Sequence, residues 1–296
     1  MSRLVSLAVV ALLGGGAAFW FITAPKTLPA DRFVDISGDA ARGESVFHAT
    51  GCASCHMAPG ATGEAQLVLA GGQAFPSDFG TFIAPNITPD RVQGIGGWSL
   101  ADLGNALQSG VSPQGTHYYP ALPYWSYAKL QPQDVADLYS FLQTLPAAAN
   151  PSQPHQIGFP FSIRRVVGGW KFLNSDSNFV VQGDLTEAEI RGRYISEAMA
   201  HCGECHTPRN ALGGLDTSRW LAGAPNPSGQ GRIPNITPAK LEWSEAEIII
   251  YLTSGFTPDY DVVGGHMVHV VENMAKLPES DRAAVAAYLK KVPAAE

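Results

Sequence analysis

The longest run of apolar positions lies at the very start of the chain. Arg3 is followed by residues 4–22, which contain no charged side chain. This length is close to the ~20 residues that a helix needs to cross a bilayer, and it exceeds the apolar region of most signal peptides. Three aromatic residues, 19–21, stand at its outer end, where membrane interfaces favour aromatic side chains. The pattern predicts an uncleaved signal-anchor helix over 1–24, and a cleaved signal peptide is the alternative.

Beyond this run, apolar positions follow a helical period in short segments separated by loops. The loops are long, since the chain holds 31 glycines and 22 prolines. Ser99 and Ser244 each stand three positions before an acidic side chain, which is the pattern of a capping box at the start of a helix. Short helices are expected over residues 39–50, 99–110, 130–146, 187–200, 244–255 and 277–293. The pattern therefore predicts a mostly α-helical protein.

The second half of the chain repeats the first. Asn-Ile-Thr-Pro occurs at 86–89 and again at 235–238, and Trp-Ser occurs at 98–99 and again at 243–244. A recurrence of about 145–150 residues is too long for a solenoid and predicts a duplicated domain. We therefore divide the chain into an anchor over 1–24, a Pro-containing tether over 25–37, a first domain over 38–146, a linker over 147–183 and a second domain over 184–296.

One part of the linker, residues 163–173, combines basic and apolar side chains. Such a segment suits a helix that lies on a membrane surface or against a partner. Two arginines and one lysine make only a thin cationic face. We therefore favour a connector that packs between the two domains.

Charge excludes one class of function. The net charge is −7 at pH 7, and 15% of the residues are charged. Nucleic-acid-binding domains carry clustered Lys and Arg, and this chain has no such cluster. We expect no nucleic-acid partner, whereas an acidic surface favours basic partners through long-range attraction.

All four cysteines fall into two C-x-x-C-H motifs. A single such motif has a redox or zinc-binding C-x-x-C as its alternative, but two motifs that use every cysteine are typical of c-type haem attachment. The two thiols add across the haem vinyl groups, and the histidine binds iron from one face. The residues are Cys52, Cys55 and His56 in the first motif and Cys202, Cys205 and His206 in the second. We expect two covalently bound haem c groups, attached after export, and no disulfide.

A longer stretch around the second motif resembles a known family. Residues 201–214 read His-Cys-Gly-Glu-Cys-His-Thr-Pro-Arg-Asn-Ala-Leu-Gly-Gly, and residues 119–124 read Tyr-Pro-Ala-Leu-Pro-Tyr. With the two Asn-Ile-Thr-Pro motifs, these stretches resemble the cytochrome c subunits of membrane-bound alcohol, aldehyde and gluconate dehydrogenases. The resemblance covers the chain from about residue 38 to its C-terminus. Well-known members carry three haem domains, whereas this chain has two.

The resemblance implies a fold, a location and partners. The fold would be two tandem cytochrome c domains, each with short helices and long loops around a haem, after an N-terminal transmembrane helix. The helix would lie in the bacterial inner membrane and the haem domains in the periplasm. Electrons would come from a periplasmic dehydrogenase and leave toward a respiratory acceptor, which is a quinone, a cytochrome or an oxidase.

The resemblance also suggests the sixth iron ligand of the second domain. Met267, which stands 24 residues after Trp243, looks like the family's axial methionine. Met274 and His266 are the competing candidates. A methionine opposite a histidine stabilises ferrous iron and raises the reduction potential, which suits an electron carrier.

The first domain departs from the family at the corresponding position. Leu122 stands 24 residues after Trp98, and related sequences carry methionine there. Leucine cannot bind iron, and Met57 directly follows His56, which holds it on the wrong face. Three interpretations remain open: His117 as a second histidine ligand, a site open to water or a small molecule, or an unusual ligand such as Tyr118, Tyr119 or Lys129.

Other residues near the motifs suggest supporting roles. Pro208 follows the second motif, so its carbonyl is expected to hold the outer nitrogen of His206. Asn86 and Asn235 are expected either to bind a haem propionate or to cap a turn.

The sequence thus predicts a membrane-anchored, periplasmic dihaem cytochrome c that transfers electrons from a dehydrogenase to the respiratory chain and has no catalytic residue of its own. The alternative is a dihaem oxidoreductase, peroxidase-like or thiosulfate-oxidising, that uses an open or unusually ligated first haem. Substrate turnover by the isolated protein would distinguish the two.

Overall fold

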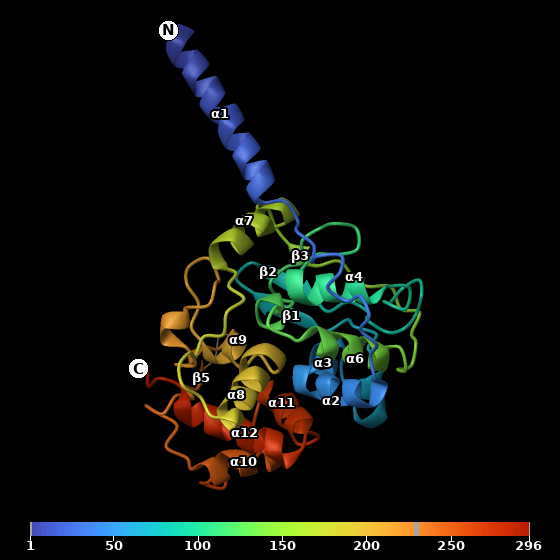
Figure 1. The fold of residues 1–296 in the computed structure, drawn as a ribbon, viewed down its shortest axis with the longest axis vertical. Helices are drawn as coiled ribbons and strands as arrows, with labels where there is room; N and C mark the ends of the chain where they lie inside the picture. Colours follow the sequence, from blue (N-terminus) through green and yellow to red (C-terminus); the bar gives the residue numbers. More distant parts are fainter. Residues whose placement is uncertain (1, 228–230, 296) are drawn as a thin grey trace.

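The computed structural model describes residues 2–227 and 231–295, which form a projecting helix and a globular part with two halves (Figure 1). The projecting helix is α1 (Ser2–Ile22), and residues 3–22 have no part buried inside the protein. Most of the remaining secondary structure is helical, as the sequence predicts.

Each half contains one C-x-x-C-H motif, which lies on α3 in the first half and begins at the N-cap of α9 in the second. The first half comprises α2 (Ala40–Thr50), α3 (Cys52–His56), the 3₁₀ helix η1 (Gly63–Leu67), β1 (Ala74–Ser77), β2 (Gly80–Ile83), α4 (Leu100–Gly104), the π-helix η2 (Asn105–Ser109), α5 (Tyr124–Tyr127) and α6 (Pro132–Leu142). Then come β3 (Gln156–Ile157) and α7 (Arg164–Asn174). The second half comprises α8 (Glu187–Arg193), the π-helix η3 (Tyr194–Met199), α9 (Gly203–His206), the 3₁₀ helix η4 (Thr217–Arg219), β4 (Ala224–Pro225), β5 (Arg232–Ile233), α10 (Glu245–Ser254), α11 (Met267–Met274) and α12 (Glu279–Lys291).

The same close helix crossing occurs in both halves. In the first, α2 packs against α6 at Gly43, and a Cβ there would overlap the carbonyl oxygen of Asp137. In the second, α8 packs against α12 at Gly192, and a Cβ there would overlap the carbonyl oxygen of Ala284. Glycine allows the two backbones to touch, so in each half the helix that precedes the C-x-x-C-H motif is held closely against a later helix.

Alanine at either crossing should destabilise the protein. We expect Gly43→Ala and Gly192→Ala each to lower the free energy of unfolding by about 2 kcal/mol, because the added methyl group forces two backbones apart. The measurement is thermal unfolding of the haem-loaded protein followed by circular dichroism. Gly169→Ala in α7 is the matched control, since its Cβ would meet only Thr23 Cγ2 at 3.7 Å. Equal midpoints for the crossing variants and the control would contradict this description.

The segment before the first half is packed against it. The Leu28 amide donates a hydrogen bond to Asn105 Oδ1 (2.7 Å), and Arg32 Nε donates one to Gln108 Oε1 (2.9 Å). The Phe33 ring fills the space above Gly104, where a Cβ would collide with it. The sequence prediction of a tether over 25–37 missed these contacts, because they join positions more than 70 residues apart.

The linker over 147–183 contains ordered elements. β3 extends the antiparallel β1–β2 pair into a sheet of order β1-β2-β3, with Gly80 opposite Ile157. Helix α7 contacts both halves: Trp170 Nε1 donates to the Leu212 carbonyl (2.8 Å), and Lys171 Nζ donates to the carbonyls of Ser109 and Gly110 (both 2.7 Å). This segment therefore does connect the two halves, as the sequence favoured.

The two halves share one continuous cluster of buried apolar side chains. Trp125 of the first half stacks at a tilt on Trp220 of the second, with ring centroids 5.8 Å apart. The Gln131 amide donates to the Tyr194 hydroxyl (2.9 Å), which itself donates to Asp134. Apolar packing and hydrogen bonds thus hold the halves in a fixed relation.

Candidate functional site: two haem-attachment motifs

The first motif lies on α3, directly after a sharp turn at the end of α2. Gly51 makes this turn with φ of 63°, a conformation that glycine adopts without strain. Cys52 is half-buried and Cys55 exposed. His56 Nδ1 lies 2.8 Å from the Pro85 carbonyl oxygen; because a carbonyl only accepts, Nδ1 carries the proton in this bond. Burial lowers the pKa of His56, so the ring is neutral and Nε2 keeps its lone pair.

The second motif, on α9, repeats this geometry. Cys202 is half-buried and Cys205 exposed. His206 Nδ1 lies 2.8 Å from the Pro234 carbonyl oxygen, and burial again lowers the pKa of the ring. Gly203 lies directly under the Trp220 ring, and any Cβ at this position would overlap it.

The proline that holds His206 is therefore Pro234, and the expectation of Pro208 is wrong. The Pro208 carbonyl instead accepts a hydrogen bond from the Asp216 amide (2.8 Å). Pro85 and Pro234 both directly precede an Asn-Ile-Thr-Pro motif. This shared proline is the signal in the sequence that could have identified the pair.

Asn86 and Asn235 were expected either to bind a haem propionate or to cap a turn, and in the structure both cap a turn. Asn86 Oδ1 accepts from the Thr88 amide (2.9 Å), and Asn235 Oδ1 accepts from the Thr237 amide (2.8 Å). Their side-chain amides bind the chain just after the last helix of the same half, at the Ala148 carbonyl (2.7 Å) and the Ala295 carbonyl (2.7 Å). Each asparagine thus fixes the loop whose proline orients the histidine.

The donor set of both motifs fits a covalently attached, histidine-ligated haem. Burial raises the pKa of Cys52 to about 11 and that of Cys202 to about 12, so both are neutral thiols. Dithiol oxidoreductases instead depend on a thiol with a lowered pKa. Within residues 2–227 and 231–295, no three His, Cys, Asp or Glu side chains gather as a metal ion would need, which disfavours a zinc site. Two thiols and one imidazole with a free Nε2 remain in each half.

The two motifs are neighbours at the boundary between the halves. Tyr127 joins them: its hydroxyl donates to the Thr50 carbonyl (3.1 Å), two residues before Cys52, and its ring contacts His201, the residue before Cys202. Tyr127 therefore brings the residues that precede the two motifs to opposite sides of one side chain.

Among the candidate sixth ligands of the second half, the structure separates the three by exposure. Met274 is only 3% exposed and belongs to the buried cluster. Met267, the first residue of α11, is half-buried at the edge of that cluster. His266 is exposed, with its ring 6.3 Å from that of Phe75. Met267 remains the prediction for this ligand.

In the first half, three of the four alternative ligands have other partners. His117 is buried, and its Nε2 donates to the Thr23 carbonyl (2.9 Å), while its Nδ1 has no partner among the described residues. The Tyr119 hydroxyl donates to the Phe161 carbonyl (2.9 Å). Lys129 Nζ donates to the Trp125 carbonyl (3.0 Å) and lies over that ring. These contacts disfavour His117, Tyr119 and Lys129 as the sixth ligand. Tyr118 is half-buried and stays a candidate beside the open site.

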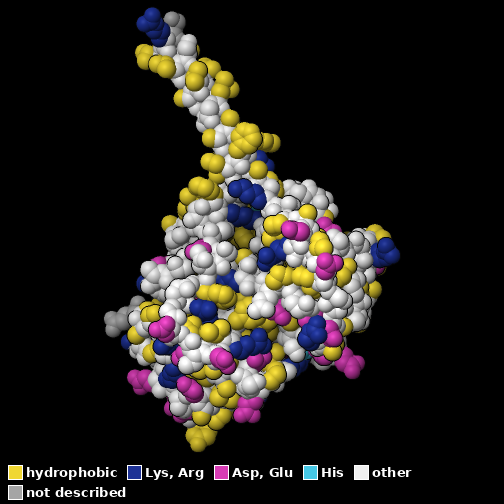
Figure 2. Space-filling model, in the orientation of Figure 1, with side chains coloured by type: hydrophobic (Ala, Val, Ile, Leu, Met, Phe, Trp, Pro, Cys, Tyr) yellow, Lys and Arg dark blue, Asp and Glu magenta, His cyan; other side chains and the backbone are white. Residues whose placement is uncertain are grey.

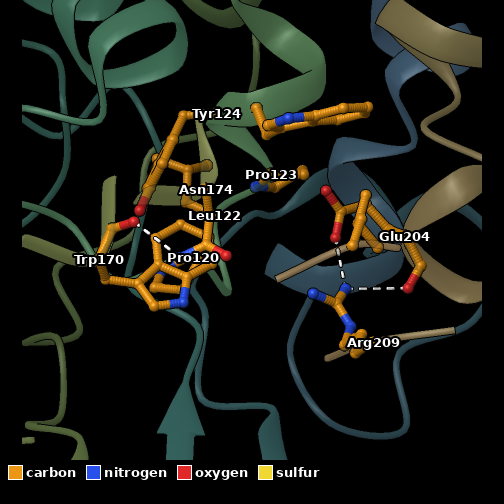
Figure 3. A pocket seen from close by; sticks show the side chains of 10 residues that line it. Pro120, Leu122, Pro123, Tyr124, Trp170, Asn174, Glu204 and Arg209 are labelled. Atoms are coloured by element: carbon orange, nitrogen blue, oxygen red, sulfur yellow. Dashed lines mark hydrogen bonds and ion pairs between the residues drawn. The ribbon is translucent and has the colours of Figure 1, made fainter. Parts of the chain in front are cut away.

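The loop that carries Leu122 meets the second half around a small cavity (Figure 3). Leu122 and Tyr124 line it from the first half, Trp170 from α7, and the ion pair of Glu204 with Arg209 from the second half. Its volume of about 10 Å³ accommodates at most a water molecule. The Leu122 loop is therefore held against the second motif by close packing.

Comparison with known proteins assigns the family. The chain is 55% identical over 296 residues to a "diheme cytochrome c-type" protein of Cereibacter sphaeroides, and the match covers all of both chains. It is 37% identical over 260 residues to the fructose dehydrogenase cytochrome subunit of Gluconobacter japonicus, covering 86% of this chain and 52% of that protein. It is 34% identical over 266 residues to the cytochrome c subunit of the quinone-dependent alcohol dehydrogenase of Gluconobacter oxydans, covering 86% of this chain and 54% of that protein.

The chain thus spans about half the length of these two dehydrogenase subunits. The family model for cytochrome c matches residues 40–146, which contain the first motif. The full-length similarity and the model match agree with the geometry of the motifs. The chain belongs to the c-type cytochromes, in the family of the diheme protein from Cereibacter sphaeroides.

Proposed function

We propose that this protein is a membrane-anchored dihaem cytochrome c that accepts electrons from a periplasmic dehydrogenase and passes them to a respiratory acceptor. The main support for this proposal is the pair of neighbouring motifs. Each has two thiols and a histidine whose Nδ1 donates a hydrogen bond to a proline carbonyl. Haem supplies one-electron redox chemistry when bound. The electron-transfer role has support from the dehydrogenase cytochrome subunits among the relatives.

In this proposal the chain's residues have distinct tasks. Cys52 and Cys55 attach the first haem, and Cys202 and Cys205 attach the second. His56 and His206 would hold the two irons through Nε2, and Met267 would supply a further ligand to the second iron. The carbonyls of Pro85 and Pro234 raise the basicity of both histidines by accepting a hydrogen bond from Nδ1–H. Leu122 leaves the first iron without a sixth side-chain ligand, so the two sites differ in potential.

The N-terminal helix supports retention in the membrane. Residues 3–22 have a mean hydropathy of 2.1 and are the one stretch of the described chain that is long and apolar enough to cross a bilayer. A signal sequence has the same composition. The residue after the helix, however, is built into the protein: Thr23 is 1% exposed and binds both His117 and Arg165. Cleavage after Thr23 would remove these bonds and the buried side chain, so we propose that α1 stays attached as the anchor.

One observation favours a second candidate, the oxidoreductase. With leucine at position 122 and with His117, Tyr119 and Lys129 engaged elsewhere, the first haem would have room for a substrate oxygen or sulfur atom. A peroxidase or a thiosulfate-oxidising enzyme would use such a site.

A pair of assays tests the proposal. We expect respiratory membranes that lack the chain to lose oxygen uptake with an alcohol, aldehyde or sugar substrate, and the purified chain to restore it. We also expect the isolated chain not to turn over peroxide or thiosulfate. If membranes that lack the chain keep normal oxygen uptake on all three substrate classes, and the isolated chain turns over peroxide or thiosulfate, the protein is an oxidoreductase and the electron-carrier proposal is wrong.

A further inference from the structure

The end of α1 and the helix α7 form one interlocked unit. The Thr23 carbonyl accepts from His117 Nε2 (2.9 Å), and Thr23 Oγ1 accepts from Arg165 Nε (3.0 Å). The Arg165 guanidinium also donates to the Trp20 carbonyl and lies over the Trp20 ring, 4.1 Å from its centroid. Gly168 leaves space for the Thr23 carbonyl, which a Cβ would overlap. The direction of α1 is therefore fixed relative to α7.

Helix α7 has two opposite faces. One faces the globular part: Val167 is buried, Trp170 binds the Leu212 carbonyl, and Lys171 binds the carbonyls that end η2. The other face meets α1. Residues 165, 168, 169 and 172 share this second face, because positions i, i+3, i+4 and i+7 lie on one side of a helix.

Toward the C-terminal end of α7, the face that contacts α1 becomes exposed apolar surface. Phe172 lies two turns beyond Arg165 on this face, and Phe172 and the adjacent Leu173 are each 68% exposed. Phe161 and Ile163, just before α7, are also exposed. Figure 1 shows α7 at the base of α1, and Figure 2 shows apolar and basic side chains gathered where α1 joins the globular part.

The basic residues of α7 are bound within the protein. Arg165 is occupied by Trp20 and Thr23, and Arg164 donates to the His117 carbonyl (3.2 Å) and stacks on the Tyr119 ring. Burial lowers the pKa of Lys171 to about 7. The surface that remains for a partner is therefore apolar.

We infer that α7 is a second membrane contact, in which Phe172 and Leu173 enter the interface of the bilayer that α1 crosses. The inference rests on the proposed anchoring by α1. The bilayer is the partner that we assign to this surface, because α1 leaves the protein from the same face of α7. A bilayer around α1 would therefore also cover the exposed apolar side chains of α7. Phenylalanine and leucine on the apolar side of a short helix are typical of helices that lie in a membrane interface. Contact through apolar side chains should depend little on salt or on anionic lipid.

A spin label tests this in the full-length, haem-loaded chain in phosphatidylcholine vesicles. The native cysteines are used for haem attachment in our proposal, so Phe172→Cys provides a single thiol for a nitroxide. Ile250→Cys on α10 is the matched control, because Ile250 is an exposed apolar residue (56%) on the helix at the end of the molecule opposite α1. We expect the label at 172 to collide with oxygen and to be protected from a water-soluble nickel chelate, and the label at 250 to show the reverse.

The outcomes separate the inference from the anchoring on which it rests. Loss of the chain from the vesicles in an alkaline carbonate wash would contradict the anchor. Retention of the chain with equal nickel access at 172 and 250 would overturn the α7 contact alone. Spin–spin broadening at 172 that disappears on dilution with unlabelled protein would assign the face to a second copy of the chain and would also overturn the inference.

Discussion

In the Leu122→Met variant we expect the first haem to gain a sixth ligand and its reduction potential to rise by about 0.2 V, within the ~0.8 V range that axial ligands cover. Position 122 stands as far from Trp98 as Met267 stands from Trp243, so the new thioether should reach the first iron as we propose that Met267 reaches the second. The exchange conserves volume and should cost less than ~1.5 kcal/mol in stability. Carbon monoxide, which we expect the native first haem to bind, should no longer bind.

Potentiometric titration and carbon monoxide difference spectra measure both effects. Leu130→Met is the control, since Leu130 is a buried core residue of the same half. We expect His117→Ala to leave the spectrum of the oxidised first haem unchanged, because the ring is bonded to Thr23. An altered spectrum in His117→Ala would identify this histidine as the sixth ligand. Unchanged potentials and carbon monoxide binding in Leu122→Met would contradict an open site behind Leu122.

The reciprocal change, Met267→Leu, should have the opposite effect on the second haem. We expect its potential to fall by about 0.2 V and its ferric iron to become high-spin, because a leucine leaves the sixth position without a donor. Electron paramagnetic resonance and potentiometry report the two changes. Both haems of this variant should then bind carbon monoxide.

Met274→Leu is the control for this experiment. It makes the same substitution on the same helix, but at a side chain that is only 3% exposed in the core. The same spectrum and potential in both variants would show that Met267 packs without binding iron. If only Met274→Leu changes the spectrum and potential of the second haem, Met274 is the sixth ligand in place of Met267.

The local features of the fold could be predicted from the sequence. Ser99 and Ser244 do form capping boxes with Asp102 and Glu247, because such a box depends on residues three positions apart. The helices expected over 130–146 and 277–293 are α6 and α12, each a few residues shorter at both ends. The expected helix over 187–200 ends its α-helical part at Arg193 and continues as a π-helix.

The features that the sequence did not reveal join distant positions. Pro234 lies 28 residues after His206, and Arg165 lies 142 residues after Thr23. A hydrogen bond to a backbone carbonyl requires no particular side chain from the acceptor, so Thr23 does not stand out by residue type, and Pro234 stands out only by its repetition at Pro85. His117 was similarly ambiguous, because a histidine near the iron and a histidine that binds a helix end look the same in sequence.

The bonds between Thr23, His117 and Arg165 also bear on how this protein meets its partners. They fix the orientation of the globular part relative to α1, which a flexible linker would leave free. With α1 in a bilayer, the haem domains would therefore keep one tilt and one height above the lipid. The motions that remain are rotation about the membrane normal and lateral diffusion in the membrane plane. A donor in the same membrane would find it by a two-dimensional search. Matching height above the membrane, more than surface charge, would decide which donors can deliver electrons.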